Sequence, residues 1–139
     1  GQARDAEFLN QHGSTCFTYD FFFKPLKRSQ ITPDNPKKGV DYVLLFYVLN
    51  ILPPQERQII AQTVTKCLDP KSGKIIIALR EDEYSIQDSW QKWEDGFITT
   101  NKTFQIIPSK NKENEKKIRL LFPEYKIERI GRGTFQLCK

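Results

Sequence analysis

The sequence predicts an α/β fold with a doubly wound, mainly parallel sheet that ends in a C-terminal antiparallel hairpin. Two near-continuous apolar runs, Val40–Leu52 and Lys74–Arg80, are typical of parallel strands buried on both faces. The segment between them repeats apolar residues at the helical period, which predicts a strand–helix–strand unit. Near the end of the chain, β-type residues flank Gly131-Arg132-Gly133, as in a hairpin. We expect one domain over residues 1–139.

The N-terminal part is predicted to contain one helix, one short strand and a long loop. The helix covers Arg4–Gln11 and stops at Gly13. Thr15–Tyr19 is rich in β-type residues and is expected to form a strand that ends at Asp20. Phe21–Gly39 has no clear period and is rich in lysine and proline, so it is predicted to be a loop.

The central helix is predicted to begin at Pro53-Pro54, where a missing backbone N–H costs nothing. Its apolar stripe consists of Ile59, Ile60, Thr63, Val64, Cys67 and Leu68. Asp69-Pro70 and Gly73 should end it, just before the second buried strand.

The pattern changes after Arg80. Ser85–Glu94 is predicted to be a short helix that carries two tryptophans, and Thr99–Ile107 to be irregular or extended. Lys112–Leu121 should be helical, followed by the hairpin strands Tyr125–Ile130 and Thr134–Cys138.

Charge leaves the nature of the partner open. The net charge of +5 and the pI near 9.1 tolerate an anionic partner such as nucleic acid without requiring one. Much of the excess lies in Lys24–Lys38 and Lys110–Lys117. The second segment also contains Glu113 and Glu115, so it fits a solvated helix face equally well.

Cysteine and histidine usage limits the chemistry. Cys16, Cys67 and Cys138 are far apart, and their odd number argues against a disulfide framework, so we expect free thiols in a reducing cytoplasm. His12 is the one histidine of the chain, which excludes sites that need two and disfavours a histidine-based triad. No metal site is expected. No apolar run has the roughly 20 residues of a membrane helix, so no membrane partner is expected either.

Ligands of open α/β sheets bind beyond the carboxyl ends of the strands. Asp20, the stretch Phe46–Asn50 and Arg80 are predicted to occupy such ends. A carboxylate at Asp20 matches the two hydroxyls of a ribose, although aspartate at a strand end also forms ordinary turns. Gly1 precedes the first helix, where glycine lets a ligand approach backbone N–H groups.

Taken together, several segments resemble bacterial class I S-adenosylmethionine-dependent methyltransferases, a Rossmann-like family, and in particular those that accompany DNA phosphorothioation genes. The matching segments are Arg4–Leu9, Tyr19-Asp20 with Phe23 and Pro25, Asp41–Val43, Tyr47–Arg57, Asp95-Gly96, Thr99 and Thr103–Gln105. The first strand and most of the glycine-rich cofactor loop of that family are missing from the sequence. Lys102 stands where relatives tend to have glycine.

The resemblance implies a role for each matched position. Gly1 corresponds to the last glycine of the cofactor loop, and Asp20 would hold the ribose hydroxyls of S-adenosylmethionine. Phe21 would flank the adenine, although three consecutive aromatics also suit plain packing. At the next strand end, the residues beside the methionine part and the methyl group would be Phe46, Tyr47 and Asn50. The substrate side would be formed by Arg80, Asp95, Thr103, Phe104 and Gln105.

The expected function is therefore methyl transfer from S-adenosylmethionine to an unidentified acceptor, either nucleic acid or a small molecule. Such transfer depends on alignment of the nucleophile, so we expect neither a triad nor a metal. Tyr47, Glu94 and Asp95 are candidates for a base. Asn50 could orient an amine or could simply cap the following helix. The alternative is an inactive, methyltransferase-like module that binds nucleic acid or a protein partner.

Overall fold

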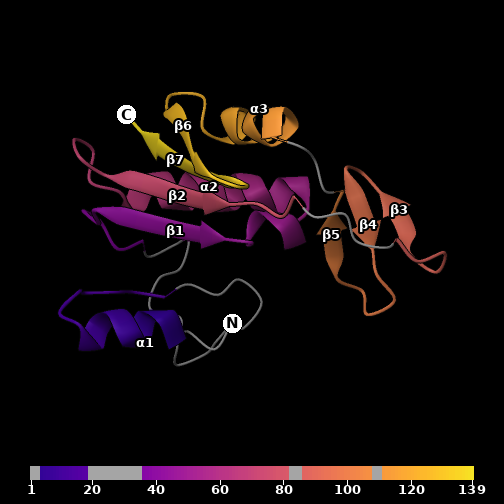
Figure 1. Cartoon of the computed structure of the whole chain (residues 1–139), viewed down its shortest axis with the longest axis horizontal. Helices are drawn as coiled ribbons and strands as arrows, with labels where there is room; N and C mark the ends of the chain where they lie inside the picture. Colours follow the sequence, from indigo (N-terminus) through magenta and orange to yellow (C-terminus); the bar gives the residue numbers. More distant parts are fainter. Residues whose placement is uncertain (1–3, 19–35, 82–85, 108–110) are drawn as a thin grey trace. The chain divides into compact units, whose positions relative to one another are not determined.

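The computed structural model describes residues 4–18, 36–81, 86–107 and 111–139. The chain divides into two compact units, Gly1–Lys37 and Lys38–Lys139, which are described separately. Figure 1 shows the elements of both along the chain.

The first unit contains helix α1 (Arg4–Gln11), as predicted. Its end is closed by Gly13, which has a φ of 85°. The strand predicted at Thr15–Tyr19 is wrong over its described part, because residues 15–18 form no strand. The reason is local: the side chain of Asn10 bonds both backbone groups of Cys16, with Nδ2 donating to the carbonyl at 3.1 Å and Oδ1 accepting from the N–H at 2.7 Å.

The second unit is built on a four-stranded sheet with the order β1-β2-β7-β6. Its strands are β1 (Tyr42–Phe46), β2 (Lys74–Ala78), β6 (Lys126–Gly131) and β7 (Thr134–Cys138). The terminal hairpin of β6 and β7 is present as predicted.

The prediction of a doubly wound, mainly parallel sheet is wrong. Among the described strands only β1 and β2 form a parallel pair, and both other pairings of this sheet are antiparallel. The terminal hairpin places β7 directly against β2, where a doubly wound sheet would continue with another parallel strand. The result is a mixed α/β domain with two separate sheets.

The second sheet replaces the helix predicted at Ser85–Glu94. It consists of β3 (Gln91–Trp93), β4 (Gly96–Ile98) and β5 (Phe104–Ile106), all antiparallel. Trp93 packs edge-on against Phe104 with ring centroids 6.2 Å apart, and Trp90 lies 6.5 Å from Phe97. The two tryptophans therefore contact aromatic rings of other strands. Their spacing in the sequence would also suit one face of a helix, so it could not distinguish the two structures.

The predicted strand Val40–Leu52 ends early. β1 stops at Phe46 because Tyr47 adopts a left-handed backbone with a φ of 61°, and the 3-10 helix η1 (Leu49–Ile51) follows. Helix α2 (Pro54–Cys67) then begins at the predicted proline pair, with Pro53 as its N-cap residue. Helix α3 (Asn111–Leu121) also lies where the sequence places it.

The two faces of the four-stranded sheet differ sharply. The closed face carries Ile75, Ile77, Phe135 and Leu137, each at most 1% exposed. Helix α2 runs behind the sheet in Figure 1 and turns a stripe of buried residues inward: Arg57, Ile60, Ala61, Thr63, Val64 and Cys67. Ile59, which was expected in this stripe, is exposed. On the open face, Tyr42, Leu44 and Phe46 follow every second residue of β1 and are all exposed.

Candidate functional site

The carboxyl end of β1 presents two exposed aromatic side chains, Phe46 and Tyr47, which we call the aromatic tip. Phe46 is 48% exposed and Tyr47 is 59% exposed. The backbone N–H of Tyr47 donates to the carbonyl of Ala78 at 2.9 Å, so this left-handed residue is fastened to the end of β2. A non-glycine residue in this conformation costs roughly 1–2 kcal/mol. The aromatic tip therefore combines backbone strain with exposed apolar surface, a combination found at ligand sites.

Asn50 lies in η1, three residues after Tyr47, and is 5% exposed. Its side-chain Oδ1 accepts a hydrogen bond from the backbone N–H of Arg80 at 3.2 Å. Asn50 therefore joins the segment after β1 to the segment after β2. The alternative of helix capping is wrong, because neither η1 nor α2 has a side-chain cap. This bond uses one of the two acceptor positions of the carbonyl oxygen, the atom that could orient an amine.

Arg57 is a residue of this region to which the sequence analysis gave no role. Its side chain is 7% exposed, and its two terminal nitrogens bind both oxygens of Asp95, with Nη2 donating to Oδ1 at 2.9 Å. Its Nε donates to the carbonyls of Leu49 at 3.1 Å and Leu52 at 2.7 Å. We call the Arg57–Asp95 pair the clamp, because it fastens the three-stranded sheet to η1 and α2.

A signal for Arg57 is present in the sequence. Arg57 precedes Ile60 and Ala61 by three and four residues, and both of these are buried. The helical period therefore places Arg57 on the inward face of α2, where a cation needs a partner. Its guanidinium also lies 5.5 Å from the ring centre of Phe104 in β5.

The residues predicted on the substrate side lie at several places in the second unit. Asp95 belongs to the clamp, and Phe104 is a buried core residue at 4% exposure. Thr103 shares a hydrogen bond with the hydroxyl of Thr99 at 2.7 Å, and Gln105 pairs with a residue of β4. Arg80 is exposed at the end of β2 and is joined to Asn50 through its backbone.

Of the three base candidates, two carboxylates are engaged within the protein. Both oxygens of Asp95 accept from Arg57, and Oε1 of Glu94 accepts from the amide of Gln55 at 3.1 Å. Tyr47 presents its side chain to solvent at the aromatic tip.

Lys102 occupies a position of glycine type. It has a φ of 57° in the turn between β4 and β5, which its N–H closes by donating to the carbonyl of Thr99 at 2.9 Å. Hairpin loops of this kind normally place glycine at the left-handed position. Lys102 therefore adopts a backbone conformation that normally favours glycine.

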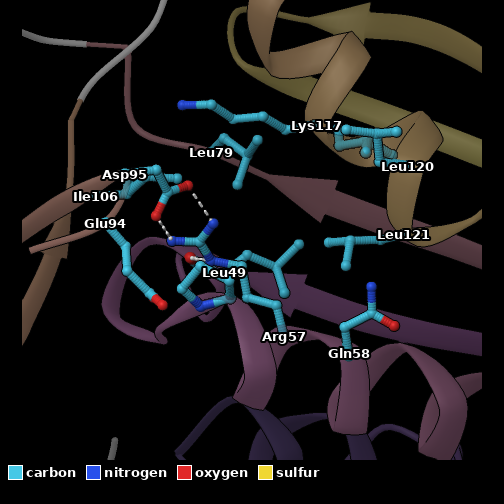
Figure 2. A pocket seen from close by; sticks show the side chains of 12 residues that line it. Leu49, Arg57, Gln58, Leu79, Glu94, Asp95, Ile106, Lys117, Leu120 and Leu121 are labelled. Carbon is cyan, nitrogen blue, oxygen red and sulfur yellow. Dashed lines mark hydrogen bonds and ion pairs between the residues drawn. The ribbon is translucent and has the colours of Figure 1, made fainter.

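A pocket of about 400 Å³ opens beside the clamp. Figure 2 shows its lining, drawn from η1, α2, α3, β5, the end of β2 and the turn before β4. The lining residues are Leu49, Pro54, Arg57, Gln58, Leu79, Glu94, Asp95, Ile106, Lys117, Ile118, Leu120 and Leu121. Most are apolar, and the charged ones gather around the clamp.

Burial lowers the pKa of the Lys117 amino group below its ordinary value, and the nearby carboxylate of Asp95 opposes this shift.

Three predicted cofactor residues, Gly1, Asp20 and Phe21, lie outside the described residues. Within the described ranges, no group of three or more histidine, cysteine or acidic residues could hold a metal ion. No helix among the described residues has the length and apolar character needed to cross a membrane. The cysteines Cys16, Cys67 and Cys138 form no disulfide with one another.

Comparison with known proteins adds no assignment, because neither a family model nor a curated protein matches this sequence. The function must therefore be argued from the residues and their arrangement.

Proposed function

We propose that the protein transfers a methyl group from S-adenosylmethionine to an acceptor in the cytoplasm. The observation that carries this proposal is the aromatic tip, where strained backbone holds Tyr47 at the end of β1 beside an exposed Phe46. S-adenosylmethionine supplies an electrophilic methyl group on a positively charged sulfur. Aromatic faces attract cations by roughly 0.5–2 kcal/mol, so exposed rings at a strand end suit this group.

The residues around the aromatic tip are better suited to align an acceptor with the methyl group than to act as an acid or a base. The bond from Asn50 to Arg80 and the clamp hold the loops that follow both parallel strands. Held loops keep an acceptor in line with the methyl group, and such orientation contributes several kcal/mol to catalysis. Free cysteines are in keeping with a reducing compartment.

Calorimetry with S-adenosylmethionine tests the proposal directly. We expect binding at micromolar concentrations, and Asp20→Ala should weaken it by about 1–3 kcal/mol because it removes a hydrogen-bonding partner of the ribose. Asp41→Ala is the matched control, since Asp41 is exposed at the amino end of β1. Equal affinity of wild type and Asp20→Ala would refute the assignment of Asp20.

A second pair of variants tests the aromatic tip. Phe46 and Leu44 lie on the same face of β1, with exposures of 48% and 44%. Phe46→Ser should weaken binding by about tenfold, through loss of aromatic contact, whereas Leu44→Ser should leave it unchanged. Equal effects of the two variants would remove the aromatic tip from the site.

The alternative is an inactive module that binds nucleic acid or a protein. Cations and carboxylates alternate on α3, where Arg119 pairs with Glu115 at 2.8 Å. This mixture favours a solvated surface over a phosphate track. Absence of S-adenosylmethionine binding together with salt-sensitive DNA or RNA binding would decide for the alternative.

A further inference from the structure

The pocket beside the clamp has a preformed apolar floor. Leu49, Leu79, Ile106 and Ile118 come from four separate segments, and each is at most 6% exposed. Since these side chains belong to the core, the floor exists before any ligand arrives. Its volume of about 400 Å³ lies in the range of small-molecule sites, roughly 300–1,000 Å³. Neither residue of the aromatic tip lines it.

The lip of the pocket is also apolar and faces water. Leu120 is 78% exposed, the highest exposure among the large apolar residues of the described chain, and Leu121 is half-buried. Figure 2 places both leucines on the side of the pocket opposite the clamp. A hydrocarbon group in this position would remove leucine surface from water, which contributes about 25 cal/mol for each Å² covered.

The other end of the pocket carries charge. Arg57 and Asp95 neutralise each other in the clamp, and the half-buried Lys117 adds a further positive charge there. The amino group of Lys117 extends toward the clamp in Figure 2, away from the two leucines. Glu94 also lines this end, but it is exposed to water and its Oε1 accepts from Gln55. Arg57 is therefore the most buried of the four charged residues, Lys117 and Asp95 are half-buried and Glu94 is exposed, so the charge that water screens least is positive, which favours an anionic group.

We infer that this pocket binds a small amphipathic carboxylate, with its hydrocarbon tail along the leucine lip and its head group at Lys117. A carboxylate near Lys117 would favour the charged form of the amino group, which burial disfavours. This inference does not depend on the aromatic tip, because neither Phe46 nor Tyr47 lines the pocket.

Octanoate is the probe that tests the inference, followed by amide-resolved NMR on the full chain. We expect saturable shifts confined to α2, α3 and β5 around the pocket. Octan-1-ol and octylamine share the tail but lack the negative charge, so each should bind at least fivefold more weakly. Equal binding of octanoate and octan-1-ol would overturn the assignment to carboxylates, and shifts centred on the open face of β1 would overturn the site.

Two variants, each with a matched control, separate the head-group contact from the tail contact. Lys117→Gln should weaken octanoate binding by about tenfold, the effect of losing a charge-assisted contact, while Lys116→Gln on the exposed side of α3 should not. Gln58→Trp should obstruct the pocket, while Gln62→Trp, exposed one turn later on α2, should not.

If Lys117→Gln unfolds, the glutamine pair still tests the site, because Gln58 and Gln62 are exposed and lie outside the core. Unchanged octanoate affinity in a folded Gln58→Trp protein would contradict the inference.

Discussion

The aromatic tip and Arg57 of the clamp lie within twelve residues of one another in the sequence, Phe46 to Arg57, yet the two features are built in opposite ways. The clamp buries Arg57 and gives its guanidinium four hydrogen bonds. The aromatic tip exposes Phe46 and Tyr47 and holds Tyr47 in a strained backbone. The hydrogen bonds of the first arrangement are made within the protein, whereas the second leaves two aromatic side chains exposed, as the proposed ligand site requires. Residues whose polar groups are all hydrogen-bonded within the protein are thus expected to maintain the fold, and exposed residues in strained backbone are expected to be available for binding.

The largest expected effect comes from breaking the clamp. Arg57→Met should lower the free energy of unfolding by about 3–5 kcal/mol, because it leaves Asp95 and two carbonyls without their partner. Urea denaturation measures this. Arg119→Met is the control, since the Arg119–Glu115 pair is exposed, with 54% and 43% of the side chains accessible, and should change stability by about 0.5 kcal/mol at most. Similar losses of unfolding free energy in Arg57→Met and Arg119→Met would contradict the distinction between the buried and the exposed ion pair.

The turn that supports the ends of the parallel strands should be nearly as sensitive. Gly133 has a φ of 58°, and an added Cβ would lie 2.3 Å from the carbonyl oxygen of Leu79. Gly133→Ala should therefore destabilise the protein by about 2–3 kcal/mol in thermal or urea unfolding. At Gly131 the nearest atom would be 3.6 Å away, so Gly131→Ala serves as the control and should be mild.

Asn50 tests the connection between the two strand ends. Asn50→Leu keeps the approximate size but strands the N–H of Arg80, which should cost about 1–3 kcal/mol. Hydrogen exchange at the Arg80 amide should accelerate in this variant. Asn101→Leu in an exposed turn is the comparison, and protection of Arg80 should persist there. Unaltered exchange of the Arg80 amide in Asn50→Leu would show that the hydrogen bond between Arg80 and Asn50 does not protect this amide.

The smallest expected change in stability is at Tyr47, and it is the one predicted increase. It therefore distinguishes the aromatic tip from the clamp most clearly. Tyr47→Gly should stabilise the protein by about 0.5–1 kcal/mol, since glycine relieves the left-handed strain and little burial is lost. The same variant should weaken binding of S-adenosylmethionine. Thermal unfolding and calorimetry on one preparation measure both. A loss of stability would mean that Tyr47 is a structural residue.

Elements with strong local signals were predictable from the sequence. The proline pair that begins α2, the helix Arg4–Gln11 and the glycine-containing hairpin each depend on contacts between near neighbours. The predicted strand at Thr15–Tyr19 failed because one side chain, Asn10, satisfies the backbone of Cys16. Residue propensities do not reveal such competition for hydrogen bonds.

Sheet topology was not predictable in the same way. The apolar runs indicate buried strands, but the pairing of β2 with β7 joins segments that are far apart in the sequence. The tryptophans of the second sheet have a spacing that suits a helix as well as a strand contact. At the candidate site, Phe46, Tyr47 and Asn50 were predicted from their place at a strand end. Arg57 was missed, although its helical spacing to Ile60 places it on the inward face of α2.

The open face of β1 has a practical consequence for work with the protein. β1 is the outermost strand of its sheet in the described chain, and Tyr42, Leu44 and Phe46 stand on it in a row. Edge strands with large apolar side chains recruit extended segments of other molecules. Preparations should therefore form oligomers as concentration rises and more readily in sulfate, which strengthens apolar association. Replacing Leu44 with lysine should suppress this behaviour without disturbing the helix-covered core.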